Sequence, residues 1–176
     1  MTTRTAGFAS ISQSGLTNGS KLLACLLMIV GGSPAGTAGG IKTTTVAVLL
    51  LTAISVLRGN KDTECYGRKI TFEIIRVGIT ITLVTFVFWL FGVTVMTVIE
   101  PQQKVLDLMF EATSAMATVG LTVDLTPVLS DISHVVLMLM MYIGRIGPMT
   151  MALIFSGHVD KKNQFRTLPE AKIMVG

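Results

Sequence analysis

Charged side chains are scarce in this sequence, at 14% of its 176 residues, whereas a soluble domain averages about 25%. Water is therefore not expected to be its main solvent. The two cysteines, Cys25 and Cys65, have no metal-ligand spacing, and no set of side chains has the makeup of a catalytic centre. Lys and Arg are not clustered as a nucleic-acid-binding face requires. These shortages argue against an enzyme, a metal site and a nucleic-acid-binding protein.

Long apolar runs are what the sequence has instead. Residues 77–99 form a run of 23 without a charge, and residues 133–156 form a run of 24 whose one charge is Arg145. A membrane-spanning helix needs about 20 residues, so each run fits one crossing. Residues 77–99 also lack the polar face that a helix in a soluble bundle requires. A third run, residues 22–57, is 36 residues long and exceeds one simple helix. We therefore predict an all-α membrane protein.

The charges predict an orientation in the membrane. Residues 58–70 carry four basic side chains against two acidic ones, and the tail after Ser156 has the same balance. Residues 100–132 carry five acidic side chains against Lys104 alone. By the positive-inside rule, the two basic regions are cytoplasmic and residues 100–132 face outward.

The longest apolar run is interrupted at its midpoint by GGSPAGTAGGIKTTT, residues 31–45. An interior Gly costs a helix about 1 kcal/mol and Pro about 3 kcal/mol relative to Ala, so an irregular backbone must be needed there. The segment departs from the phosphate-binding pattern G-x-x-x-x-G-K-[ST], because Ile41 stands between Gly40 and Lys42 and no strand precedes it. A kinked helix and a flexible intramembrane loop remain as interpretations.

A second irregular segment follows a short helix. Residues 104–117 are expected to form a helix of about 20 Å, whereas the hydrocarbon core is about 30 Å thick. The glycine-containing segment TVGLT, residues 118–122, comes next. A half-length helix ending in such a segment is the plan of a re-entrant loop, which membranes tolerate only where protein buries it or water lines it. A helix lying along the lipid headgroups is the alternative.

A short internal repeat favours the re-entrant loop. Thr5-Ala6-Gly7-Phe8 matches Thr118-Val119-Gly120-Leu121 at an offset of 113 residues, and the same offset pairs Gly31 with Gly144. Two loops of one type, each followed by a disturbed helix, indicate duplicated units. Glycine permits a left-handed backbone that turns carbonyl oxygens toward one axis, where they can replace the hydration shell of a cation. Asp124, just beyond, would either attract cations or cap a solvated loop.

The segments TRTAGF, GGSPAGTAGGIKTTT, ATVGLT, GRIGP and LPEAKIMVG resemble the Trk/Ktr superfamily of potassium transporters, above all its bacterial KtrB-type (TrkH-like) subunit. The resemblance implies four units of helix, pore helix and helix around one pore, with K⁺ passing along backbone carbonyls of filter loops. The filter would include Thr5, Ala6, Gly7, Phe8, Thr118, Val119, Gly120 and Leu121. A gate beneath it would include Gly31, Gly32, Ser33, Pro34, Gly36, Thr37, Gly39, Gly40 and Arg145. Arg145 would either repel K⁺ as part of the barrier or be tied to loop carbonyls.

The family pattern also divides the chain. Residues 1–58 would end the third unit with a filter loop and a broken helix, residues 59–70 would form a cytoplasmic loop, residues 71–157 the fourth unit, and residues 158–176 a cytoplasmic tail. Two earlier units have no counterpart, so the chain is expected to be a carboxy-terminal fragment. The alternative to K⁺ uptake is a non-conducting fragment or an accessory membrane protein.

Location and partners follow from the same resemblance. It implies a multi-pass protein of the bacterial plasma membrane, a homodimer in the full-length form, and a cytoplasmic ring of RCK-type nucleotide-binding regulatory subunits. Residues 58–70 and 158–176 are the candidate docking surfaces. K⁺ would be the transported ion in channel-like transport or symport, with Na⁺ as a candidate coupling ion, no cofactor in this chain and no nucleic acid.

Overall fold

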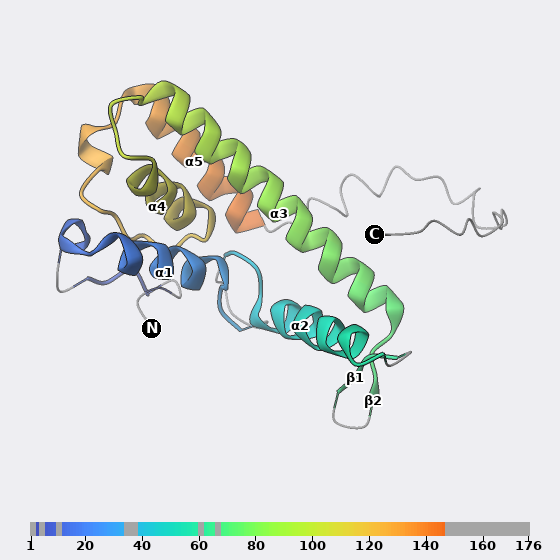
Figure 1. The fold of residues 1–176 in the computed structure, drawn as a ribbon. Helices are drawn as coiled ribbons and strands as arrows, with labels where there is room; N and C mark the ends of the chain where they lie inside the picture. The colour runs from blue at the N-terminus through green and yellow to red at the C-terminus, as the bar shows by residue number, and fades with distance from the viewer. Residues whose placement is uncertain are drawn as a thin grey trace, which may run out of the picture.

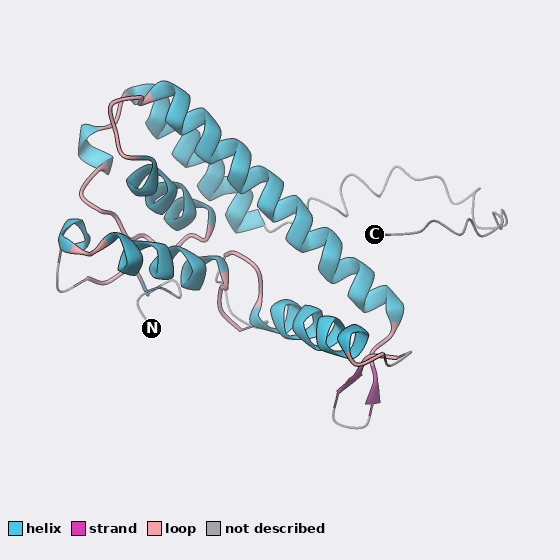
Figure 2. Cartoon of the chain, viewed as in Figure 1, coloured by secondary structure: helices cyan, strands magenta, loops and turns pink. Residues whose placement is uncertain are grey.

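The computed structural model describes residues 3, 6–9, 12–33, 39–59, 62–65 and 68–146, and these are mainly helical (Figures 1 and 2). The α-helices are α1 (Asn18–Ile29), α2 (Thr43–Leu57), α3 (Phe72–Ile99), α4 (Val105–Met116) and α5 (Asp131–Ile146). The 3₁₀ turns η2 (Gln13–Gly15) and η3 (Thr126–Val128) precede α1 and α5, and the short strands β1 (Glu64–Cys65) and β2 (Arg68–Lys69) pair antiparallel.

The longest helix is α3, with 28 residues and a length of about 42 Å. Within the described residues, it alone is both long and apolar enough to cross a membrane, whereas α1 and α2 are apolar but shorter. α3 ends at Ile99, because Pro101 disfavours helical backbone at Glu100. Its hydroxyls bond within the helix, each donating to the carbonyl four residues earlier at 2.8–2.9 Å, from Thr80, Thr82, Thr85, Thr94 and Thr97.

The short helix α4 lies at the centre of the fold and contacts α1, α3 and α5 (Figure 1). It coincides with the helix expected at residues 104–117, since Lys104 and Ala117 are its caps. One apolar cluster joins it to α3 and α5 and includes Met96, Leu108, Met116, Leu137 and Met140. A second cluster joins α4 and the loop after it to α1, through Cys25, Met28, Phe110, Ala117, Val119, Leu121 and Val123. Because both sides of α4 are covered, it is enclosed by protein rather than spread along a surface.

The third apolar run forms two helices, α1 and α2, and the described residues between them, 30–33 and 39–42, are not helical. The two ends of the intervening segment are held together. Gly31 donates its N–H to the Ile41 carbonyl at 2.9 Å, and Ile41 donates its own to the Ile29 carbonyl at 3.0 Å. Val30 and Ile41 thereby form an isolated parallel bridge. The segment thus leaves and re-enters the fold at one point, and the broken transmembrane helix stays a prediction.

Residues 59–70, expected as a loop, contain the β1–β2 pair, which the sequence analysis did not foresee. In this pair Glu64 lies opposite Lys69 and Cys65 opposite Arg68. The hairpin is joined to the end of α2, because the Ser55 hydroxyl donates to the Asp62 carbonyl at 2.8 Å. It follows that α2 and the hairpin lie together, next to the beginning of α3 (Figure 1).

Candidate functional site

The two glycine loops of the internal repeat lie against each other. Gly7 and Gly120 both have left-handed backbone, with φ values of +66° and +86°. A methyl group on Gly7 would lie 2.6 Å from the Val119 carbonyl oxygen and 3.7 Å from the Gly120 Cα atom. Two loops 113 residues apart in the sequence therefore meet through their backbones.

The loop after α4 is anchored on one side and open on the other. Val119 and Leu121 are each only 4% exposed, and both pack in the apolar cluster against α1. Gly120, between them, is exposed. Alternate burial of this kind leaves the backbone at Gly120 accessible on the side opposite the cluster. In the other loop, Ala6 and Phe8 are exposed.

Thr118 carries unusual backbone geometry at the end of α4. The Thr118 N–H donates to the Ala115 carbonyl at 3.0 Å, and the Val119 N–H to the Ser114 carbonyl at 2.9 Å. This pair of bonds is the Schellman motif, in which glycine usually takes the left-handed position. Here Thr118 takes it, with φ of +52°, although such a backbone is rare for a β-branched residue. Its side chain must therefore be required at that position.

The Thr118 hydroxyl links the loop after α4 to the segment between α1 and α2. Its Oγ1 atom accepts the Gly39 N–H at 3.2 Å. A methyl group on Gly39 would lie 2.8 Å from that same Oγ1 atom and 2.9 Å from the Ala117 carbonyl oxygen. Only a glycine allows this approach, so the contact explains both Gly39 and the strained Thr118.

Some of the other predicted gate residues lie near the Gly39–Thr118 contact, and the rest lie outside the described residues. Gly31 is buried, and a methyl group there would collide with the Gly39 carbonyl oxygen. Gly40 is left-handed at φ +75°, beside the Ile29 carbonyl oxygen. Gly32 and Ser33 continue from Gly31, half-buried and exposed respectively. Outside the described residues lie Thr5, Pro34, Gly36 and Thr37.

A cavity of about 620 Å³ opens beside the loop after α4. Its wall includes residues 118–122 and three residues of α5, Met141, Tyr142 and Arg145. Arg145 is exposed and lies in the last turn of α5. The structure therefore brings this arginine and the Gly120 loop to the same cavity.

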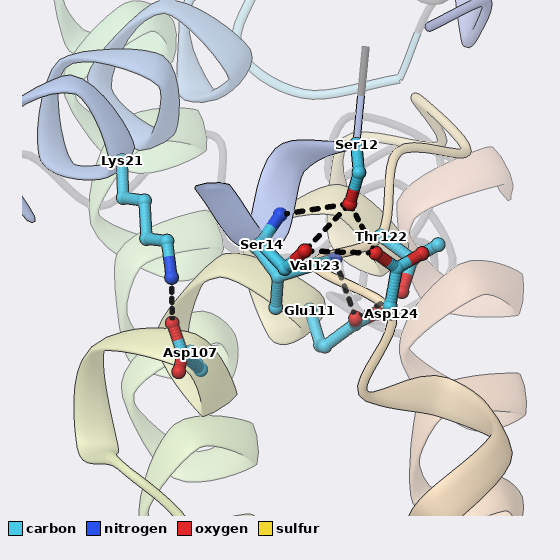
Figure 3. Close-up of polar contacts among 8 residues, drawn as sticks. All are labelled: Ser12, Ser14, Lys21, Asp107, Glu111, Thr122, Val123 and Asp124. Atoms are coloured by element: carbon cyan, nitrogen blue, oxygen red, sulfur yellow. Dashed lines mark hydrogen bonds and ion pairs between the residues drawn. The ribbon is translucent and has the colours of Figure 1, made fainter. Parts of the chain in front are cut away.

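Glu111 is a site residue that the sequence analysis counted only as one more outward-facing acid. It lies on α4, is 5% exposed and reaches the loop after α4 (Figure 3). Its carboxylate accepts hydrogen bonds from the Thr122 hydroxyl, from the Val123 N–H at 3.1 Å and from the Thr126 hydroxyl at 3.0 Å. The available signal was an acidic residue in the middle of a helix whose residues after Asp107 are otherwise apolar or small.

Two further polar contacts hold the outer side of the site. The Lys21 ammonium and the Asp107 carboxylate, in the first turns of α1 and α4, form an ion pair at 2.7 Å (Figure 3). Asp124 is exposed, and it accepts hydrogen bonds from the Ser12 hydroxyl and, at 3.1 Å, from the Ser14 hydroxyl. Both contacts join the chain that follows Gly7 to the α4 region, so Asp124 caps the junction of the two loops.

The Asp124 contact is expected to depend on pH. The Ser12 hydroxyl, and then the Ser14 hydroxyl, lower the pKa of this carboxyl from its ordinary value. A lowered folded-state pKa adds stability that is present above the ordinary Asp pKa of about 3.9 and is lost as pH falls through the lowered value. Asp124→Asn is therefore expected to lower the melting temperature slightly at pH 6 and by a smaller amount at pH 3. An equal effect at both pH values would contradict this assignment.

A family model described as TrkH, cation transport protein, matches residues 1–166. The chain belongs to the TrkH family. Ktr system potassium uptake protein B of Bacillus subtilis (strain 168) is 36% identical over 176 residues, which are 100% of this chain and 39% of that protein. Potassium/sodium uptake protein NtpJ of Enterococcus hirae is 35% identical over 179 residues, covering 100% of this chain and 40% of that protein. Ktr system potassium uptake protein D of Bacillus subtilis is 32% identical over 174 residues, covering 99% and 38%.

The TrkH-family chain spans about two fifths of the length of the curated relatives it matches. The resemblance read from the sequence motifs is thereby confirmed at the level of the family. The description of the family is that of a transport protein and not of an enzyme. Membership in it is consistent with a membrane location, and the helical structure fits the all-α class expected of this TrkH-family member.

Proposed function

We propose that this chain supplies part of a K⁺ uptake pathway, in which the two touching glycine loops form half of a selectivity filter. The residues would be Thr5, Ala6, Gly7 and Phe8 from one loop and Thr118, Val119, Gly120 and Leu121 from the other. The observation that carries this proposal is the contact of two left-handed glycines, Gly7 and Gly120, at the carboxyl end of the enclosed helix α4.

The geometry suits a dehydrated cation for two physical reasons. An ion that leaves water needs oxygen ligands, and backbone carbonyls provide them without a negatively charged side chain. The carboxyl end of α4 also directs the negative end of its dipole, about half an elementary charge, toward residues 118–120. Neither contribution depends on an acidic group within the loop itself.

The segment between α1 and α2 is proposed to gate this pathway. Gly39 and Gly40 stand where it touches the end of α4, Gly31 packs on Gly39, and Gly39 bonds directly to Thr118 of the proposed filter. A change in this segment would therefore be transmitted to the filter through this hydrogen bond and the close approach of Gly39 to the Ala117 backbone. The proposed gate also includes Gly32, Ser33, Pro34, Gly36 and Thr37.

Arg145 is proposed to contribute an electrostatic barrier in the cavity beside the filter loop. A fixed positive charge there raises the energy of a cation that enters the same cavity. Arg145→Ala is expected to increase the K⁺ uptake rate or to weaken its regulation, and Arg145→Lys is expected to preserve both. Unaltered uptake and regulation in Arg145→Ala would remove this role.

The wider setting is proposed on the names of the relatives and the predicted orientation. The chain would cross a bacterial plasma membrane several times, with residues 1–58 and 71–157 in two pore units and with residues 59–70 and 158–176 on the cytoplasmic side. The Ktr system proteins are named as parts of systems, which supports a multi-subunit assembly. We propose a homodimer that docks an RCK-type nucleotide-binding subunit.

Rubidium uptake in cells that lack K⁺ importers tests the proposed function. The chain is expressed alone and, in parallel, in place of the matching part of the Bacillus subtilis potassium uptake protein B. Rubidium uptake by the chimera that is saturable and is inhibited competitively by K⁺ would support the proposal. Uptake by the chimera but not by the chain alone would show that the chain forms one half of the ion pathway and needs the other half. A chimera that reaches the membrane and takes up no rubidium would refute the proposal.

A further inference from the structure

Glu111 binds the stretch of chain that follows the filter loop, and it lines the same cavity as Gly120 and Arg145. Its Oε1 atom accepts from the Thr122 hydroxyl and from the Val123 N–H at 3.1 Å, while Oε2 accepts from the Thr126 hydroxyl at 3.0 Å. The two hydroxyls also lie 3.0 Å from each other. Both carboxylate oxygens are thus used to hold one short stretch of chain, residues 122–126.

The position of this stretch determines where the preceding residues lie. Residues 118–121 are fixed at their first end by the Schellman motif at Thr118 and in their middle by the buried Val119 and Leu121 side chains. The other end has the three hydrogen bonds to Glu111. Glu111 belongs to the rigid, enclosed helix α4, so it connects the far end of the loop to the helix from which the loop begins.

We propose that Glu111 is a positioning residue that sets the spacing of the carbonyl oxygens in residues 118–121, and with it the discrimination of K⁺ from Na⁺. This inference rests on the proposed function. Na⁺ is smaller than K⁺ and needs shorter distances to its oxygen ligands, so a loop that can contract accepts Na⁺ more readily. A loop tied at both ends to α4 resists contraction.

The hydrogen bonds separate positioning by Glu111 from simple attraction by its charge. In Glu111→Gln, the amide oxygen can accept from Val123 and Thr122, while the amide nitrogen donates to the Thr126 oxygen and the Thr126 hydroxyl turns to Thr122. All partners stay bonded although the negative charge is gone. In Glu111→Leu the volume is similar, but the Val123 N–H loses its acceptor and the two hydroxyls keep only each other as partners.

The test measures rubidium uptake by the chimera described above, with increasing Na⁺ or K⁺ as competitor. The quantity measured is the inhibition constant of Na⁺ for rubidium uptake divided by that of K⁺. Glu111→Leu is expected to lower this ratio by about tenfold or more, because a buried donor is left unpaired. Glu111→Gln is expected to stay within about threefold of the parent, since its hydrogen bonds are rewired rather than lost. A Gln variant as impaired as the Leu variant would overturn positioning in favour of charge.

Glu100 provides a matched control, because it is also a glutamate that accepts a backbone N–H and a hydroxyl, from Ser130 at 2.8 Å and Ser133 at 3.0 Å. It caps the end of α3 and holds the start of α5 rather than the chain next to residues 118–121, so Glu100→Leu is expected to leave the Na⁺ to K⁺ ratio unchanged. A shift in the ratio equal to that of Glu111→Leu would contradict the proposal. It would show that the loss of any glutamate that accepts such hydrogen bonds changes the ratio, wherever it lies.

Two milder variants keep the inference testable if Glu111→Leu does not accumulate. Thr122→Val and Thr126→Val each remove a hydroxyl that donates to Glu111 and keep the side-chain shape. Each is expected to shift the ratio in the same direction and by less than Glu111→Leu. Unchanged ratios in both, with rubidium uptake intact, would overturn the role of Glu111 and leave the proposed function standing. Loss of uptake in the unsubstituted chimera would instead overturn the proposed function.

Discussion

Replacing Gly144 with alanine is expected to destabilise the chain more than any other single methyl addition within the described helices. In α5 a Cβ atom at this position would collide with the Met116 carbonyl oxygen and lie 2.8 Å from the Met116 carbonyl carbon. Backbone cannot rotate away as a side chain can, so α5 would have to separate from the end of α4. Overpacking typically costs about 1–3 kcal/mol, and we expect Gly144→Ala to reach the upper end.

Two other helical glycines provide a graded comparison. In α3, a methyl group on Gly78 would lie 3.5 Å from the Thr45 Cγ2 atom, which is an ordinary contact. On Gly92 it would lie 2.5 Å from the Met140 Cε atom, the far end of a flexible side chain. Since Ala favours a helix over Gly by about 1 kcal/mol, Gly78→Ala should be neutral or stabilising and Gly92→Ala close to neutral.

The measurement is the melting temperature of the purified protein in one detergent. A change of 1 kcal/mol corresponds to about 2–4 °C for a chain of this size, so Gly144→Ala should lower it by several degrees. Equal melting temperatures for the Gly144→Ala and Gly78→Ala proteins would show that α4 and α5 do not approach as closely as described.

Replacing Gly7 with alanine is expected to produce the largest loss of uptake with little loss of folded protein. Two penalties coincide at this residue. The left-handed backbone costs an alanine about 1–2 kcal/mol, and the methyl group would stand 2.6 Å from the Val119 carbonyl oxygen. Because that oxygen belongs to the proposed filter, its displacement changes the coordination of the ion directly. We expect rubidium uptake by the chimera to fall by more than about tenfold.

Gly120→Ala and Gly15→Ala separate the two penalties. Gly120 has φ of +86°, but a methyl group there would have open space, with the Gly7 Cα atom 4.0 Å away. Gly15 is not left-handed and has nothing within 4 Å. Uptake should therefore decrease in the order Gly15→Ala, Gly120→Ala, Gly7→Ala. Equal uptake by the Gly7→Ala and Gly15→Ala proteins would exclude Gly7 from the conducting path.

Much of the helical arrangement could be predicted, because it follows from hydropathy and length. The uncharged run at residues 77–99 lies within α3, and the short helix expected at 104–117 coincides with α4. The internal repeat was informative in a physical sense. Its paired glycines, Gly31 and Gly144, are both positions where a methyl group would meet a backbone carbonyl oxygen. These two paired glycines therefore marked positions where separate segments of the backbone touch.

The polar contacts of the site could not be predicted, because they depend on how the loop after α4 turns back. Glu111 finds its partners at Thr122, Val123 and Thr126, and no local pattern indicates that this stretch returns to α4. Thr118 was placed in the filter for its position next to Val119 and Gly120. Its left-handed backbone and its bond to Gly39 depend on the distant segment between α1 and α2.

The length of α3 makes the molecule sensitive to the thickness of its bilayer. Residues 77–99, at 1.5 Å each, measure about 34 Å, against about 30 Å of hydrocarbon. An apolar stretch longer than the hydrocarbon core is accommodated by tilting or kinking of the helix or by local thickening of the bilayer. α2 packs on α3 at Gly78. α4 packs on α3 through Trp89, whose ring N–H donates to Thr113 at 2.9 Å. A change in the tilt of α3 would therefore be expected to move α2 and α4 together. We therefore expect the length of the lipid chains to affect the position of the glycine loops, through α3 and α4.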